Sequence, residues 1–150
     1  MARLVAPALV VIALGGLGCA DSERALPTAC TEGGRAVAAA LRAAPAQVAL
    51  RDGTRLSTCV ERARGDAEIQ TVGSIYTRVA DGLAARVRSS DSAALRLGYL
   101  IGAARRGARH TSGIHEELVR RLEQSVGLGG PVPSRRPSFY RGVTAGARNG

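Results

Sequence analysis

The stretch DAEIQTVGSIYTRVADGLAARV, residues 66–87, has the strongest helical pattern in this sequence. Its apolar side chains recur at intervals of three and four residues, which places them on one stripe of an α-helix. The stripe consists of Ile69, Val72, Tyr76, Val79, Leu83 and Val87. Because a stripe of this kind has to be covered by other elements, the stretch predicts a domain built from packed helices.

Four more helices are expected around this one. They cover residues 28–44, a short segment opened by a capping box at Thr58 and Glu61, a segment from Asp91 to about Ala108, and residues 112–126. Asp66 and Asp91 are expected to cap their helices. The residues expected to face the core from the last two helices are Leu97, Ile101, Ala104, Ala108, Ile114, Leu118, Leu122 and Val126. Pro45 should end the first helix, and Asp52-Gly53 predicts a turn or a very small hairpin.

Two glycines on the fourth helix point to a close helix contact. Gly98 and Gly102 are four residues apart, and small residues at this spacing let a neighbouring helix approach closely. The same spacing is used by membrane helices, but Arg105, Arg106 and Arg109 follow on the same segment. Close packing inside the domain is therefore expected.

The chain beyond residue 126 differs in composition from the helical part. Residues 127–150 are expected to form a Gly/Pro/Arg-rich linker and a weakly helical tail. Phe139 and Val143 are the apolar side chains through which the tail could dock on the bundle. The sequence leaves open whether it docks there or stays separate.

The first eighteen residues predict export from the cytoplasm. Arg3 is followed by the uncharged run LVAPALVVIALGGLG, which is shorter than the roughly 20 residues of a membrane-spanning helix. The run ends in Gly18-Cys19, which resembles the lipobox of bacterial lipoproteins, where the cysteine thiol receives a diacylglycerol before cleavage on its N-terminal side. The resemblance implies a signal peptide over residues 1–18, lipidation of Cys19, a lipid-anchored tether over residues 19–29, and attachment to a membrane outside the cytoplasm.

The lipobox resemblance has one departure. The usual motif has Leu three residues before the cysteine, whereas here Gly16 holds that place and Leu17 follows it. An ordinary signal peptidase could instead read Gly18 and Ala20, and would release a secreted protein that begins at Asp21.

The two remaining cysteines predict a disulfide. Without Cys19, the chain has Cys30 and Cys59, and an even count in an oxidising compartment favours one bridge. Such a bridge would add roughly 3–4 kcal/mol of stability on the chain-entropy model. With 150 residues, the chain has room for one domain of ordinary size. The predicted fold is all-α, a small four- to five-helix bundle with one disulfide, over residues 30–126.

Positive charge is concentrated in the last third of the chain. The net charge is +9, and all 21 basic residues are Arg, an excess that also fits the GC-rich codons shared by Arg, Ala and Gly. A possible face for an anionic partner is formed by Arg105, Arg106, Arg109, Arg120, Arg121, Arg135 and Arg136. The partner could be an anionic lipid, an envelope polymer or an acidic protein. No nucleic acid is expected, because the chain is exported and has few aromatic side chains for stacking.

Catalytic signatures are weak in this sequence. His110 and His115 are five residues apart, which leaves them about 140° apart around a regular helix, too far for a shared zinc ion. Glu117 and Arg121 predict a surface ion pair. We therefore expect no catalytic residues, no metal and no cofactor, and a non-enzymatic lipoprotein that serves interaction, binding or envelope structure. The alternative is an envelope-bound or secreted enzyme that uses His110, His115 and Glu116.

Overall fold

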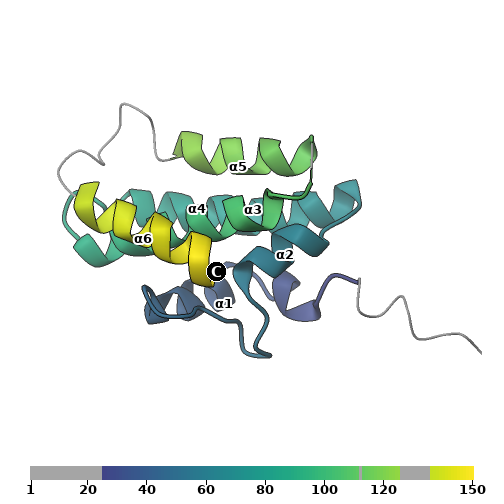
Figure 1. Ribbon diagram of the computed structural model, residues 1–150, viewed down its shortest axis with the longest axis horizontal. Coiled ribbons are helices and arrows are strands. Elements are labelled where there is room, and N and C mark those ends of the chain that lie inside the picture. The colour runs from purple at the N-terminus through teal and green to yellow at the C-terminus, as the bar shows by residue number, and fades with distance from the viewer. Residues whose placement is uncertain (1–24, 112, 126–135) are drawn as a thin grey trace, which may run out of the picture.

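The helix α4 (Asp91–Ala108) is the centre of the structure, and most other helices pack against it. This computed structural model describes residues 25–111, 113–125 and 136–150. In Figure 1, α5 (Ile114–Ser125) lies along the top, above α3 (Asp66–Ala84) and α4, which overlap in this view. The yellow α6 (Arg136–Asn149) and the helix α2 (Leu56–Arg62) lie lower in the picture. Within the described residues the secondary structure is helical apart from one isolated β-bridge, so the expected all-α domain is confirmed.

Burial extends around α4 from Ala93 to Ala104, where only the half-buried Arg96 is not fully buried. The core side that the sequence predicted is confirmed, because Leu97, Ile101, Ala104 and Ala108 are all buried. The opposite side is buried as well, with Leu95, Ala103 and other small or apolar residues. A helix segment with apolar residues all around its axis is buried by neighbouring elements on all sides. Together α2, α3, α5 and α6 provide this cover.

The apolar stripe of residues 66–87 faces the core as expected, and all six of its side chains are buried. The helix begins at Asp66 with Gly65 as its N-cap, one residue earlier than predicted for the cap. Likewise, the N-cap of α4 is Ser90, whose hydroxyl accepts from the backbone N–H of Ala93 at 3.2 Å. In both helices the predicted aspartate is instead the first helical residue, where a carboxylate still complements the helix dipole.

The expected single helix over residues 28–44 is wrong. The segment consists of a 3-10 turn, η1 (Thr28–Thr31), then α1 (Gly34–Ala40) and a second 3-10 turn, η2 (Leu41–Ala43). Gly33 separates the first two pieces with a φ of 98°, a left-handed conformation that a continuous helix cannot contain. The expected end before Pro45 is confirmed.

The Thr58–Glu61 capping box is also wrong. The helix α2 begins two residues earlier, at Leu56, and its N-cap Arg55 makes no side-chain cap. Leu56 and Ser57 are both buried, so the first turn of α2 belongs to the core and not to an exposed entry loop. The predicted small hairpin around Asp52-Gly53 is confirmed as a single antiparallel bridge between Ala49 and Arg55.

The tail docks on the bundle as the helix α6. It runs parallel to α4, since Gly98 lies against Phe139 and Val143 while Gly102 lies against Val143 and Ala147. Two glycines of α6, Gly142 and Gly146, lie in the same way against the backbone of α4. The predicted close approach at Gly98 and Gly102 is therefore confirmed, and α6 is the helix that makes it.

The helix α5 covers α3 and α4 from the other side. Leu118 and Leu122 are buried as expected, whereas Ile114 is 45% exposed and the expectation for it is wrong. Val126 lies outside the described residues. No helix in the described ranges is long and apolar enough to cross a membrane.

Candidate functional site

The disulfide joins η1 to the middle of α2. Cys30 and Cys59 form it, with their Cα atoms 5.4 Å apart and both residues fully buried. The predicted bridge is thus present, and it closes the N-terminal end of the described chain onto the core. Cys19 and the rest of residues 1–24 lie outside the described residues.

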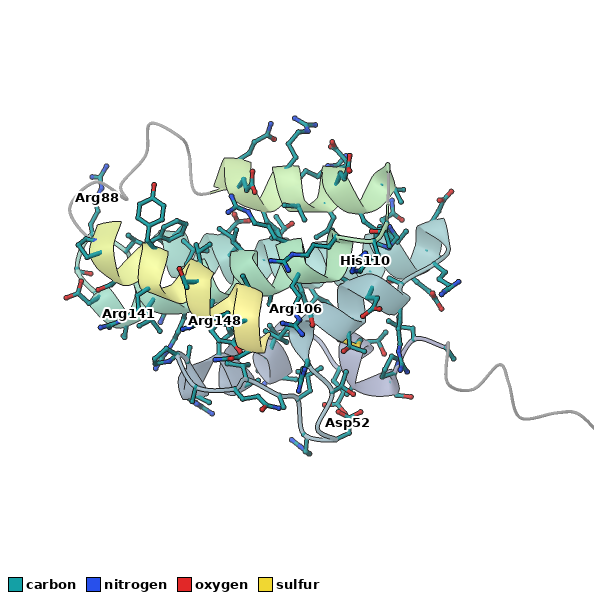
Figure 2. The ribbon with its side chains drawn as sticks, viewed as in Figure 1. Asp52, Arg88, Arg106, His110, Arg141 and Arg148 are labelled. Carbon is teal, nitrogen blue, oxygen red and sulfur yellow. A yellow bond between two sulfur atoms is a disulfide. The ribbon has the colours of Figure 1, made fainter. Side chains whose placement is uncertain are left out.

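The two histidines are used differently. His115 is buried, and its Nε2 atom lies 2.7 Å from the backbone oxygen of Ala63 at the end of α2. Because a carbonyl oxygen can only accept, Nε2 is the protonated nitrogen and donates this hydrogen bond. His110 is exposed in the turn after α4 (Figure 2). Glu116 is exposed on α5. Within the described part of the chain, no group of three His, Cys, Asp or Glu side chains is placed to hold a metal ion.

We predict that His115→Leu lowers the free energy of unfolding by about 1–3 kcal/mol, because the buried Ala63 carbonyl loses its donor. The exposed His110→Leu is the matched control, with an expected change within about 0.5 kcal/mol. Urea unfolding followed by circular dichroism measures both. Equal effects of the two substitutions would contradict a structural role for His115.

Several arginines of the predicted basic face are paired with carboxylates. Glu117 accepts from the Nε atoms of Arg120 at 2.7 Å and Arg121 at 2.8 Å, which confirms the expected Glu117–Arg121 ion pair. The hydrogen bonds from Arg120 and then from Arg121 lower the pKa of Glu117 to about 2. Arg105 pairs with Glu123 on α5 at 2.7 Å. These three arginines therefore offer less free positive charge than their number suggests.

A shallow depression of about 280 Å³ lies between α4 and α5, where part of the predicted face comes together. Its charged lining consists of Arg105, Arg109, Arg120, Glu116 and Glu123. Three guanidinium groups and two carboxylates nearly balance there. This surface is consequently mixed in sign and does not select strongly for an anion.

Arg106 has a different task. Its Nη1 atom donates to the backbone oxygens of Ala147 at 3.2 Å and Arg148 at 2.6 Å, at the C-terminal end of α6. Carbonyl groups at the end of a helix have no partner within that helix, and a cation there is favourable. Figure 2 shows Arg106 and Arg148 near the C-terminal end of α6. The side chain of Arg106 therefore fastens α6 to α4.

We expect Arg106→Met to destabilise the protein by about 1–2 kcal/mol, because two carbonyl groups lose a charged donor while the apolar stem is kept. The loss should appear first as faster amide hydrogen exchange in α6. Arg109→Met removes an exposed arginine at the C-cap of the same helix and serves as the control, with a change within about 0.5 kcal/mol. Unchanged exchange in α6 of the Arg106 variant would contradict the fastening role.

The remaining arginines of the set are in separate places. Arg109 is exposed, Arg135 lies outside the described residues, and Arg136 is described only as the first residue of α6. Farther along α6, Arg141 and Arg148 are exposed. Of the predicted face, the described arginines on α4 and α5 are therefore mostly balanced by carboxylates, whereas Arg141 and Arg148 on α6 were not part of that prediction.

A groove between α3 and α5 was not anticipated from the sequence. Its volume is about 640 Å³, and its apolar lining consists of Ile69, Gly73, Ile114 and Leu118. Charged groups of both signs surround it, including Arg78, Asp81 and Glu117. The signal in the sequence was Gly73, a residue without a side chain on the side of α3 that faces Leu118 of α5. Because both signs are present, the groove does not favour one charge class of ligand.

Comparisons with models of protein families, with curated proteins and with solved structures find no match to this chain.

Proposed function

We propose that this protein is a lipid-anchored module outside the cytoplasm that acts through interaction, binding or envelope structure and not through catalysis. The observation that carries the proposal is the Gly18-Cys19 pair at the end of the apolar run in residues 1–18. The thiol of Cys19 would carry the lipid, and residues 19–29 would hold the domain within about 30 Å of the membrane surface.

The Cys30–Cys59 bridge supports export as a separate line of reasoning. The two cysteines are paired in the described core, and bridges of this kind form chiefly in chains that fold in an oxidising compartment. The bridge also accounts for the two cysteines that remain after Cys19. In this proposal Cys19 carries the lipid, and Cys30 and Cys59 form the disulfide.

The use of the polar side chains favours binding over catalysis. His115 donates to a backbone carbonyl, Arg106 holds the end of α6, and Glu117 is engaged by two arginines. These groups stabilise the fold. The alternative enzyme would need His110, His115 and Glu116 to converge, and a stoichiometric metal ion in the purified protein would favour it over our proposal.

The anchor is tested with Cys19→Ala in the native host. We expect the variant to leave the membrane fraction, whereas the matched tether variant Ser22→Ala stays there. Mass spectrometry of the wild-type N-terminus should find an acylated Cys19. An unmodified N-terminus at Asp21 would show release by an ordinary signal peptidase, and a membrane-bound Cys19→Ala protein would overturn the anchor.

A further inference from the structure

We propose that the outer face of α6 is a contact surface for an anionic lipid bilayer. The outer face consists of the exposed residues Pro137, Tyr140, Arg141, Thr144 and Arg148. At 100° per residue these five side chains fall within about 100° of the helix circumference. They point away from the glycine side, which packs on α4. The inference rests on the proposed attachment through Cys19, because the anchor keeps this face near a membrane.

Charge sets the outer face of α6 apart from the other basic surfaces. The chain has no Asp or Glu after Glu123, so the charged residues of α6 are all arginines. Among the described residues, neither the Arg141 nor the Arg148 side chain is in an ion pair, in contrast to Arg105, Arg120 and Arg121. An anionic surface would therefore meet these two guanidinium groups without having to displace a carboxylate.

An aromatic side chain accompanies the arginines. Tyr140 is 56% exposed, and Phe139 supports its ring edge-on with the ring centroids 5.5 Å apart. Tyrosine is enriched at the boundary between lipid and water, where its ring lies among the headgroups and its hydroxyl stays hydrated. Figure 2 places Arg88, in the turn between α3 and α4, at the end of the molecule where α6 begins. Arg88 adds another exposed cation at that end.

The shape of the outer face suits a bilayer better than a small anion or a peptide. The two cavities described above lie between α3 and α5 and between α4 and α5, and no residue of α6 lines either of them. The outer face of α6 is one side of a single helix, and one side of a helix lacks the concave walls that small ligands need. Each basic residue near an anionic leaflet contributes only about 1 kcal/mol. This weak attraction becomes effective when a tether of about 30 Å holds the face close to the surface.

The test uses the unacylated mature chain, with Cys19→Ser, and lipid vesicles. The core residues and the disulfide of the structure lie between Ala29 and Ala145, so this chain retains them. The vesicles contain phosphatidylcholine with about 30 mol% phosphatidylglycerol, or phosphatidylcholine alone. We expect binding to the anionic vesicles that weakens with salt. Arg141→Gln/Arg148→Gln should lower the partition coefficient about 25-fold, as two losses of about fivefold each.

The matched control removes the same charge elsewhere. Arg51→Gln/Arg64→Gln changes two exposed arginines outside α6, and we expect a loss of about threefold or less, because charges beyond a Debye length are screened. Circular dichroism should be unchanged in both double variants. Tyr140→Ser should lower binding to both kinds of vesicle.

Three results would overturn the proposal. They are equal losses in the two double variants, equal binding to neutral and anionic vesicles, and tighter binding to soluble polyglutamate with the same dependence on Arg141 and Arg148, which would assign the face to an acidic polymer. Because the assay uses an unacylated chain, its outcome is independent of lipidation at Cys19. Failure of the anchor and failure of this surface can therefore be told apart.

Discussion

The double variant Gly98→Ala/Gly102→Ala is expected to destabilise the protein by about 3 kcal/mol and to loosen α6, although Gly to Ala in a free helix is stabilising. A Cβ atom at Gly98 would collide with the backbone oxygen of Phe139 and lie 2.9 Å from the backbone nitrogen of Val143. At Gly102 it would meet Val143 and Ala147 in the same way. Backbone atoms cannot rotate aside as the end of a flexible side chain can, so α6 has to move outward.

Two opposing contributions decide whether the double variant is more or less stable than the wild type. Replacing glycine by alanine in a helix gains about 1 kcal/mol in propensity, whereas overpacking a close contact costs about 1–3 kcal/mol or more at each site. The two costs are not fully additive, since one outward movement of α6 relieves both collisions. The gap left by that movement also exposes Tyr99 and Ala103, which are fully buried in the native packing.

Gly82→Ala is the matched control for this prediction. Gly82 is an exposed residue of α3, and a Cβ atom added there would meet nothing within 4 Å. We expect this variant to be more stable by about 0.5–1 kcal/mol, through helix propensity alone. Urea unfolding followed by circular dichroism gives both values, and hydrogen exchange locates the change in α6. A stabilised Gly98→Ala/Gly102→Ala protein would show that the two helices are not in backbone contact.

The contrast between α3 and α4 shows what periodicity in this sequence can predict. The buried side of α3 could be predicted because the opposite side of this helix is polar. Its apolar residues therefore recur visibly at helical spacing. In α4 both sides are buried, and the pattern identified one core side while Leu95, Tyr99 and Ala103 on the other were missed. Ile114 continues the spacing of α5, but it lines the groove between α3 and α5 and is 45% exposed there.

The tail contains a second pair of glycines with the same four-residue spacing as the pair in α4. Gly98 and Gly102 predicted a close partner helix, and Gly142 and Gly146 repeat the same four-residue spacing on α6. The tail has few large apolar side chains, so its pattern is weak by hydropathy. It is held by backbone contact and by Arg106, and neither depends on apolar content.

The arginines of the predicted basic face show that a count of charges does not predict which of them are paired. The Glu117–Arg121 pair could be predicted because residues four apart lie side by side on a helix. Arg105 and Glu123 are on different helices, and Arg106 reaches carbonyl groups more than forty residues away. Such partners depend on the packing of α4, α5 and α6. The sequence therefore predicted the amount of positive charge near the C-terminus and not the part of it that stays unpaired.

Removal of the Cys30–Cys59 disulfide is expected to lower the free energy of unfolding strongly. The variant Cys30→Ala/Cys59→Ala opens a loop with a sequence separation of 29, which costs about 3.5 kcal/mol on the chain-entropy model. Domains of this size have a total stability of about 5–15 kcal/mol, so the loss is a large share of the total. The segment with η1 and α1 should be affected most, since it is short, interrupted at Gly33 and fastened to α2 through Cys30.

A reducing agent provides the internal control for the disulfide. Reduction should lower the unfolding midpoint of the wild-type protein to about that of Cys30→Ala/Cys59→Ala, and should leave the double variant unchanged. Thiol titration of protein purified from the native host without reductant should find no free thiol at either position. If those thiols are free and the reductant changes nothing, the chain folds in a reducing compartment. Export, the anchor at Cys19 and the membrane face of α6 would then lose their common basis.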